Sequence, residues 1–161
     1  MHNKKILFVC LGNICRSPAA EAILKKNLQN KNLHDKIYVD SAGTAGYHIG
    51  ESPDPRMIAY AAKRGYTVEH TTRKFNPAKD FIKFDYIITM DNENFKDVKS
   101  HDNVNKFSHK IFRMADFCKN IKVDEVPDPY YEGKKGFNNV LDILEDGCKG
   151  ILEKLKNENH L

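Results

Sequence analysis

The sequence has no tryptophan, only four cysteines among its 161 residues, and no long apolar run. The longest such run, residues 6–11, is far shorter than the roughly 18 residues that cross a bilayer, which excludes a transmembrane protein. The run ends at Gly12 without a cleavage site of small residues, so we expect no secretory signal and a cytoplasmic location. The cysteines are too few and too widely spread for a disulfide framework or a zinc finger, and we expect no metal and no cofactor.

The charge balance disfavours a nucleic-acid-binding protein. The 26 Lys and Arg residues barely exceed the 22 Asp and Glu residues, for a net charge of +4, and they occur as scattered pairs such as Lys25-Lys26. We expect most of this charge to be solvated surface that leaves a weak field favouring anionic ligands. A second core would leave each half too small, so residues 1–161 are predicted to form a single domain, and we expect a monomer.

Short apolar runs alternate with segments of helical periodicity. The predicted strands are residues 6–9, 37–39, 86–90 and 111–114. The predicted helices contain the apolar stripes Ala20-Ile23-Leu24-Leu28, Met57-Ile58-Ala61-Ala62, and a long stripe between Phe137 and Leu155 that includes Cys148. This alternation predicts a three-layer α/β fold, in which helices cover both faces of a parallel sheet through right-handed crossovers.

Polar residues follow every predicted strand, as expected if a ligand binds at the carboxyl edge of the sheet. These residues are Cys10–Ser17, Asp40–Gly43, Asp91-Asn92, and Asp116 followed later by Asp128. Loops after strands are often polar for other reasons, so this pattern alone supports a site only weakly. Cys148, in contrast, belongs to a core stripe and is predicted to serve packing.

The most informative segment is residues 9–18, between the first predicted strand and the first predicted helix. Pro18 suits the first turn of that helix. A loop entering a helix can turn successive N–H groups inward around an anion such as phosphate, and Gly12 and Asn13 best tolerate the positive φ that this requires. Cys10 at the edge of this loop would be favoured as a thiolate by the N–H groups and the helix dipole, which predicts a nucleophile.

Three further side chains complete a mechanism for a phosphate monoester. Arg16 has the planar fork that holds two phosphoryl oxygens, and Ser17 either donates its hydroxyl to the Cys10 sulfur or simply caps the helix. Asp128, stiffened between two prolines, is the candidate proton donor for the leaving group, although such an Asp also forms turns. Tyr130 and Tyr131 beside it suit an aromatic leaving group.

The chain resembles the low-molecular-weight protein tyrosine phosphatases along essentially its full length. The resemblance rests on residues 9–18 (VCLGNICRSP), 40–44 (DSAGT), 85–91 (DYIITMD) and 128–131 (DPYY). It implies a flavodoxin-like fold with four parallel strands in the order 2-1-3-4. It also implies hydrolysis of phosphotyrosine in proteins through a phosphocysteine intermediate, and inhibition by phosphate-like oxyanions.

The resemblance assigns roles to individual residues. It implies Cys10 as nucleophile, Arg16 as phosphate clamp and Asp128 as general acid and then base. The implied phosphate-binding loop consists of Cys10, Leu11, Gly12, Asn13, Ile14, Cys15, Arg16 and Ser17, supported by a hydrogen-bond network of Asn13, Ser17, Ser41 and His70. The implied substrate cleft is lined by Leu11, Ile14, Tyr47, Tyr130 and Tyr131. Cys15 is implied as the redox partner with which an oxidised Cys10 forms a reversible disulfide.

Three alternatives remain beside this interpretation. Arsenate reductases share the anion loop, but their disulfide relay needs a close cysteine pair in the middle of the chain, whereas the remaining cysteines here are Cys118 and Cys148. Protein arginine phosphatases resemble the chain as well, but carry a smaller polar residue where Ile14 stands. A non-catalytic phosphotyrosine-binding or redox-sensing module is disfavoured because Cys10, Arg16 and Asp128 are all present.

Overall fold

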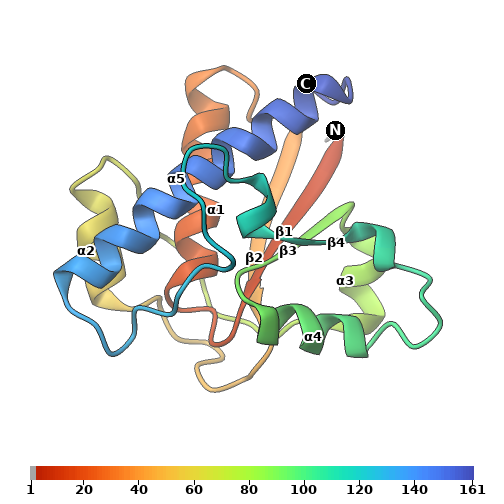
Figure 1. The fold of residues 1–161 in the computed structure, drawn as a ribbon, viewed down its shortest axis with the longest axis horizontal. Helices are drawn as coiled ribbons and strands as arrows, with labels where there is room; N and C mark the ends of the chain where they lie inside the picture. The colour runs from red at the N-terminus through yellow and green to blue at the C-terminus, as the bar shows by residue number, and fades with distance from the viewer. Residues whose placement is uncertain (1–2) are drawn as a thin grey trace.

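The computed structural model describes residues 3–161 and contains one parallel sheet. Its strands are β1 (Lys4–Cys10), β2 (Ile37–Gly43), β3 (Tyr86–Thr89) and β4 (Ile111–Arg113). They lie in the order β2-β1-β3-β4, and every neighbouring pair is parallel (Figure 1). All four predicted strands and their implied order are confirmed. The third and fourth strands are each one residue shorter than predicted; the fourth ends at Arg113 because Met114 already begins a 3-10 helix.

Helices cover both faces of the sheet, as predicted (Figure 1). The helices are α1 (Arg16–Asn30), α2 (Pro55–Ala62), α3 (Pro77–Lys83), α4 (Asn92–Ser100) and α5 (Lys134–Asn157), with short 3-10 helices η1 (Ser108–Lys110) and η2 (Met114–Phe117). Ile6 and Phe8 of β1 pack in one core with α1 and α5, whereas Leu7 and Val9 pack in a second core with α3 and α4. Burial on both faces explains why residues 6–9 of this strand are all apolar.

The predicted helical stripes are confirmed in α1 and α5. Every residue of the α1 stripe is buried, and so is every apolar residue of the α5 stripe, including Cys148. The stripe predicted for α2 is too wide. Met57 and Ala61 are buried, but Ala62 is exposed. Ile58 is partly buried against the same core, so three of the four stripe positions contact it and only Ala62 points away.

The sequence patterns did not predict α3 and α4. Each is short, and few of its side chains are buried: Asp80 and Phe81 in α3, Asn94 and Val98 in α4. Side-chain caps by Asn76 and Asp91 define where they begin. None of the helices within residues 3–161 is both long and apolar enough to cross a membrane.

Candidate active site

Residues 10–17 join β1 to α1 as a loop whose carbonyl groups point outward. The carbonyl oxygens of Cys10, Leu11 and Ile14 accept hydrogen bonds of 2.8–2.9 Å from backbone N–H groups of neighbouring loops. A trans peptide directs its C=O and its N–H to opposite sides, so the amides that follow these carbonyls turn to the inside of the loop. Within the described part of the chain, no N–H group of residues 12–15 donates to a protein acceptor. The loop is therefore a concave set of free donors, suited to an anion.

Asn13 is the residue that makes this bend. Its φ is 58°, in the left-handed region that asparagine tolerates better than most residues. The expectation that Gly12 would share a positive φ is wrong, since the only glycines with positive φ within residues 3–161 are Gly50 and Gly65. Gly12 instead lies close to the ring of His48: a Cβ atom there would come within 3.3 Å of it, so a larger residue would require the His48 side chain to shift slightly.

The buried Asn13 side chain connects the loop to the residues around it. Its amide nitrogen donates to the hydroxyls of Ser17 and Ser41 at 2.9 and 3.0 Å. Its oxygen accepts from the Arg73 backbone N–H at 2.9 Å and lies 2.8 Å from His70 Nε2. The structure thus brings together all four residues predicted as a supporting network, and every polar atom of the Asn13 amide has a partner.

Cys10 and Cys15 lie in the same loop in different surroundings. The Cys10 sulfur is 3.0 Å from Ser17 Oγ, which can donate its proton to a thiolate. Burial, helped by the Asp54 carboxylate, raises the pKa of the Cys15 thiol far above its usual value. Cys15 therefore stays protonated at neutral pH, and the loop presents a single sulfur suited to act as a nucleophile.

This difference predicts selective alkylation. Iodoacetamide at neutral pH should modify Cys10 first, because burial raises the pKa of Cys118 to about 11 and raises that of Cys148 further. Mass spectrometry of the digested protein should find one rapid adduct, on the peptide that contains Cys10, and inorganic phosphate should slow its formation. A first adduct on Cys15 or Cys118 would contradict this assignment of reactivity.

Arg16 is buried beneath the loop among carboxylates. Its guanidinium donates to Asp91 Oδ2 at 2.6 Å and to the Val126 carbonyl at 3.1 Å, and its other terminal nitrogen lies 3.6 Å from Asp128 Oδ2. Burial lowers the pKa of Arg16, but the charges of Cys10 and Asp91 outweigh this effect and raise the pKa above its ordinary value. The side chain is therefore a fixed cation at the floor of the site.

Asp91 is a site residue whose role the sequence did not reveal. One oxygen of its carboxylate holds Arg16, while the other accepts from the Asn94 backbone N–H at 2.7 Å and caps α4. The Arg16–Asp91 contact joins residues 75 positions apart, so no local pattern indicates it. One carboxylate thus connects the start of a helix to the phosphate-binding arginine.

Asp91→Asn should separate these two functions. Asparagine caps helices as well as aspartate does, so α4 should be retained, but the buried Arg16 loses its anionic partner. We expect kcat/KM for aryl phosphates to fall by about 10- to 100-fold, with the unfolding midpoint changed little. Steady-state kinetics and thermal denaturation measure the two effects, and Asp91→Ala, which also removes the cap, should lower both. Unchanged kinetics in Asp91→Asn would contradict this role.

Asp128 lies on the segment between η2 and α5, which contains no other helix or strand. Its carboxylate accepts from the Tyr130 backbone N–H at 3.1 Å, in the turn that the flanking prolines favour. Besides the Val126 carbonyl, which accepts from Arg16, further backbone hydrogen bonds hold this segment. The buried Asp146 carboxylate accepts backbone N–H groups of residues 119–121, and the Val126 N–H donates to the Met90 carbonyl at the end of β3.

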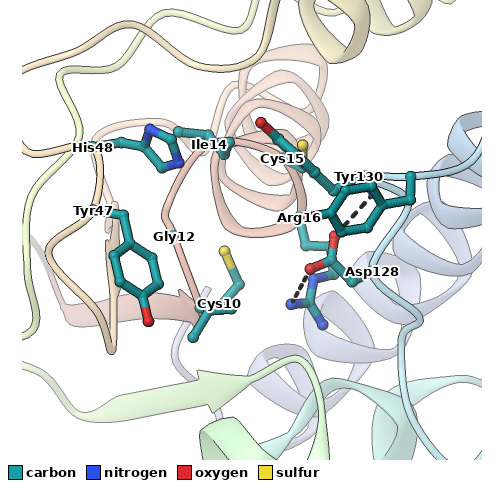
Figure 2. Close-up of a pocket in the computed structure, with 11 residues that line it drawn as sticks. Cys10, Gly12, Ile14, Cys15, Arg16, Tyr47, His48, Asp128 and Tyr130 are labelled. Carbon is teal, nitrogen blue, oxygen red and sulfur yellow. Dashed lines mark hydrogen bonds and ion pairs between the residues drawn. The ribbon is translucent and has the colours of Figure 1, made fainter.

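A cavity of about 250 Å³ joins these groups. It is lined by Cys10, Leu11, Gly12, Ile14, Cys15, Arg16, Tyr47, His48, Asp128, Tyr130 and Tyr131. Figure 2 shows Cys10 between Tyr47 and His48 on one side and Asp128 and Tyr130 on the other. All five residues predicted to line the cleft are in this lining, whereas Ser41 and His70 lie behind the loop and act on it only through Asn13.

Two residues outside the predicted set shape this cavity. Arg56 lies over the ring of Tyr130, 5.3 Å from its centroid, and pairs with Asp54 at 2.8 Å, so it supports the aromatic wall. Gly43 allows β2 to approach the loop, because a Cβ atom there would lie 2.7 Å from the Leu11 carbonyl oxygen. Residues 40–44 stand out as a motif in the sequence, but the contact of Gly43 with the loop is visible only in the structure.

Comparisons with known proteins agree with this geometry. Residues 5–161 match the family model described as low molecular weight phosphotyrosine protein phosphatase. A putative low molecular weight protein-tyrosine-phosphatase of Synechocystis is 47% identical over 96% of this chain and 98% of its own length. The crystal structure of a protein tyrosine phosphatase from Entamoeba histolytica is 50% identical, covers 97% of this chain and 99% of that chain, and has a TM-score of 0.93.

A second similar structure is that of a Drosophila arginine phosphatase, 35% identical over 94% of this chain and 98% of that chain, with a TM-score of 0.86. The fold places Cys10 and the loop in a cavity at the carboxyl edge of a parallel sheet. With these matches over nearly its whole length, the chain belongs to the low molecular weight phosphotyrosine protein phosphatase family.

Proposed function

We infer that the protein hydrolyses phosphotyrosine in proteins, and small aryl phosphates, through a phosphocysteine intermediate. The observation that carries this inference is the convergence of Cys10, Arg16 and Asp128 on one cavity with aromatic walls. A sulfur nucleophile, a fixed cation and a carboxyl group are the three elements that transfer of a phosphoryl group from an aryl ester requires.

In the first step, the Cys10 thiolate attacks phosphorus, and the bond from phosphorus to the tyrosyl oxygen breaks. The loop amides and the Arg16 guanidinium hold the non-bridging oxygens as charge spreads over them. Protonated Asp128 gives its proton to the departing oxygen, so tyrosine leaves as a neutral phenol. The products are dephosphorylated tyrosine and phosphocysteine at Cys10.

In the second step, water replaces the phenol. Asp128, now a carboxylate, accepts a proton as the water oxygen attacks phosphorus, and the bond between sulfur and phosphorus breaks. Ser17, whose Oγ is 3.0 Å from the sulfur, donates to the thiolate that leaves. Inorganic phosphate departs and Asp128 is protonated again, so the cycle balances with water as the only co-reactant. Phosphate-like oxyanions should inhibit by occupying the same loop.

The cavity walls favour an aryl ester. Ile14 and Leu11 offer apolar contact to a ring, and Tyr130 and Tyr131 pack edge-to-face with centroids 5.0 Å apart at the entrance. The alternatives are less well supported. Neither Cys118 nor Cys148 lines the cavity, so a disulfide relay has no third sulfur there, and Ile14 offers no polar group to a phosphoguanidinium.

Trapping the intermediate tests the proposal. The purified protein is mixed with a phosphotyrosine peptide, quenched in denaturant during turnover and digested, and mass spectrometry should find phosphate on the Cys10 peptide. Parallel reactions use phosphoserine and phosphoarginine peptides and arsenate with thiol. We expect turnover of phosphotyrosine to exceed the others by at least about 100-fold. Preferred turnover of phosphoarginine or arsenate, or phosphate on another residue, would overturn the assignment.

We further propose that Cys15 protects Cys10 from oxidation. Peroxide takes two electrons from the two thiols, forms a Cys10–Cys15 disulfide and is reduced to water. Both cysteines are free and buried in the same loop. Wild type treated with mild peroxide should regain nearly full activity with thiol, whereas Cys15→Ser should regain little, because Cys10 then oxidises beyond the reversible stage. Equal recovery in both would refute the pairing.

We also propose that residues 1–161 form a single domain that acts as a monomer in the cytoplasm, on phosphotyrosine-containing proteins and without nucleic acid or membrane. The scattered distribution of the basic residues supports the absence of a nucleic-acid partner.

A further inference from the structure

The turn that carries the proton donor makes few polar contacts with the rest of the chain. Within residues 3–161, every hydrogen bond of residues 127–132 stays inside that stretch, including the one from the Tyr130 N–H to Asp128 Oδ1 at 3.1 Å. Across the cavity, the other oxygen of Asp128 lies 3.6 Å from Arg16. The local hydrogen bonds fix the shape of the turn, but they do not set its distance from the phosphate-binding loop.

Arg56, the second residue of α2, reaches this turn from the side. The central carbon of its guanidinium lies over the Tyr130 ring, 5.3 Å from the centroid. The same carbon lies 4.8 Å from the centroid of Phe137, a fully buried ring in the first turn of α5. A cation is attracted to the face of an aromatic ring, so Arg56 ties the turn after Asp128 to α2 and to the start of α5.

Asp54 fixes the Arg56 side chain and connects it to the phosphate-binding loop. Its Oδ1 accepts from Arg56 Nε at 3.1 Å and its Oδ2 from Nη2 at 2.8 Å, a two-point contact that holds the guanidinium in one plane. The Asp54 carboxylate is buried, and its backbone N–H donates to the Ile14 carbonyl at 2.8 Å. The guanidinium over Tyr130 is therefore held at a defined place relative to the loop that binds phosphate.

The position of Tyr130 matters for the proton because its N–H selects one oxygen of Asp128. Oδ1 accepts that N–H, so in the protonated carboxyl group Oδ2 is the oxygen that carries the hydrogen. Oδ2 is also the oxygen that lies 3.6 Å from Arg16, on the side of the phosphoryl group. A shift of Tyr130 would move this proton away from the leaving oxygen, and a displacement of about 1 Å in an active site can cost up to 100-fold in rate.

We propose that Arg56 is a positioning residue for the proton transfer, and that it acts through the Tyr130 ring to hold the Asp128 carboxyl group at working distance from the phosphate-binding loop. The inference rests on the proposed function of Asp128 as general acid and then base. Arg56 does not line the catalytic cavity, so its effect on the reaction is indirect. Its loss should slow the step that moves a proton and leave oxyanion binding unchanged.

Arg56→Met tests this role, because it removes the cation but leaves the backbone N–H that Asp54 caps. We expect kcat/KM for phenyl phosphate, which reports the first step, to fall by about 10-fold. For p-nitrophenyl phosphate, whose phenolate leaves readily without a proton, the fall should be less than about 2-fold. Arg56→Lys keeps a cation that can reach both Asp54 and the ring, so it should recover most of the lost rate.

A double-mutant cycle shows whether Arg56 acts through Asp128. In the Asp128→Asn background, Arg56→Met should change kcat/KM for phenyl phosphate by less than about 2-fold, because the proton that it helps to place is already missing. Calorimetric titration should find tungstate affinity within about 2-fold of wild type in Arg56→Met, since the loop amides and Arg16 are retained.

Arg64→Met is the matched control. It makes the same substitution just beyond the end of α2, at an arginine that pairs with Asp142 and Glu145 of α5, and it should leave the rates for both substrates unchanged. Circular dichroism checks that each variant folds, and Arg56→Gln takes the place of Arg56→Met if that variant does not.

Two outcomes would overturn the inference alone. Unchanged kinetics in Arg56→Met would show that the contact with Tyr130 does not position the acid. Equal slowing of both substrates in both backgrounds, with weaker tungstate binding, would show that Arg56 supports the phosphate-binding loop through Asp54 instead. Equal slowing of both substrates by Asp128→Asn itself would overturn the proposed role of Asp128 and this inference with it, so the two failures are distinguishable.

Discussion

Cys10→Ser should abolish hydrolysis while leaving oxyanion binding intact. A serine hydroxyl is ionised far less than a thiol at neutral pH, and in the first step Asp128 carries the proton for the leaving group, so it cannot deprotonate the serine. We expect kcat for a phosphotyrosine peptide to fall by about 10⁴-fold or more. The loop amides and Arg16 are unchanged in this variant, so tungstate, a tetrahedral oxyanion, should bind within a few-fold of wild type.

Stopped assays and calorimetric titration with tungstate measure the two quantities on the same preparation. Cys15→Ser is the matched control, because it removes the other sulfur of the same loop and should retain most of the activity in the presence of thiol. Substantial turnover by Cys10→Ser would mean that another group carries the phosphate. Loss of tungstate binding would mean that the sulfur, and not the ring of amides, organises the site.

Asp128→Asn should slow the reaction most for substrates whose phenol is a poor leaving group, because such a leaving group depends on protonation. Asparagine keeps an oxygen that can accept the Tyr130 N–H, so the turn should persist, but it cannot supply a proton. For phenyl phosphate we expect kcat to fall by about 10²- to 10⁴-fold. For p-nitrophenyl phosphate, whose phenolate leaves readily without protonation, the loss in the first step should be much smaller.

The measurement is kcat for a series of aryl phosphates that differ in the acidity of the phenol, in wild type and in Asp128→Asn. The dependence on leaving group should be steeper in the variant. Adding a good phosphate acceptor such as a small alcohol separates the second step, where the variant also lacks its base. An equal slowing of all substrates would show that Asp128 positions the substrate or Arg16 and does not donate a proton.

The sequence predicted those parts of the fold that produce a pattern among residues close together in the chain. Residues 6–9 are apolar at every position because both faces of β1 are covered, and the stripe of α5 runs through more than five turns, so both were clear. The phosphate-binding loop was predicted for the same reason, since its nucleophile, arginine and serine occur within eight residues. Helices α3 and α4 were missed because they bury only two residues each and are defined mainly by their caps.

The parts that sequence could not predict depend on contacts between distant segments. In the sequence, Asp91 cannot be told from an ordinary helix cap. Only the pairing of β1 with β3 places it beside Arg16. From the sequence, Glu21 would be expected on the surface of α1, but it is buried and accepts a hydrogen bond from the Ser41 hydroxyl. The interpretation of Gly12 has a similar origin: glycine suggested a positive φ, whereas the structure shows no positive φ there and a close approach to the His48 side chain.

The groups that bind phosphate and the group that moves the proton belong to parts of the fold with different resistance to local opening. The loop of residues 10–17 is continuous with β1 and α1, whose side chains fill both cores. Asp128 is carried by a segment without helix or strand, which is held by Asp146 and by the bonds of Val126 to Met90 and Arg16. Regions with few such anchors open at a lower free-energy cost than the core. We therefore expect local opening to move Asp128 before it disturbs the loop of residues 10–17, which would give a form that still binds substrate but turns it over slowly.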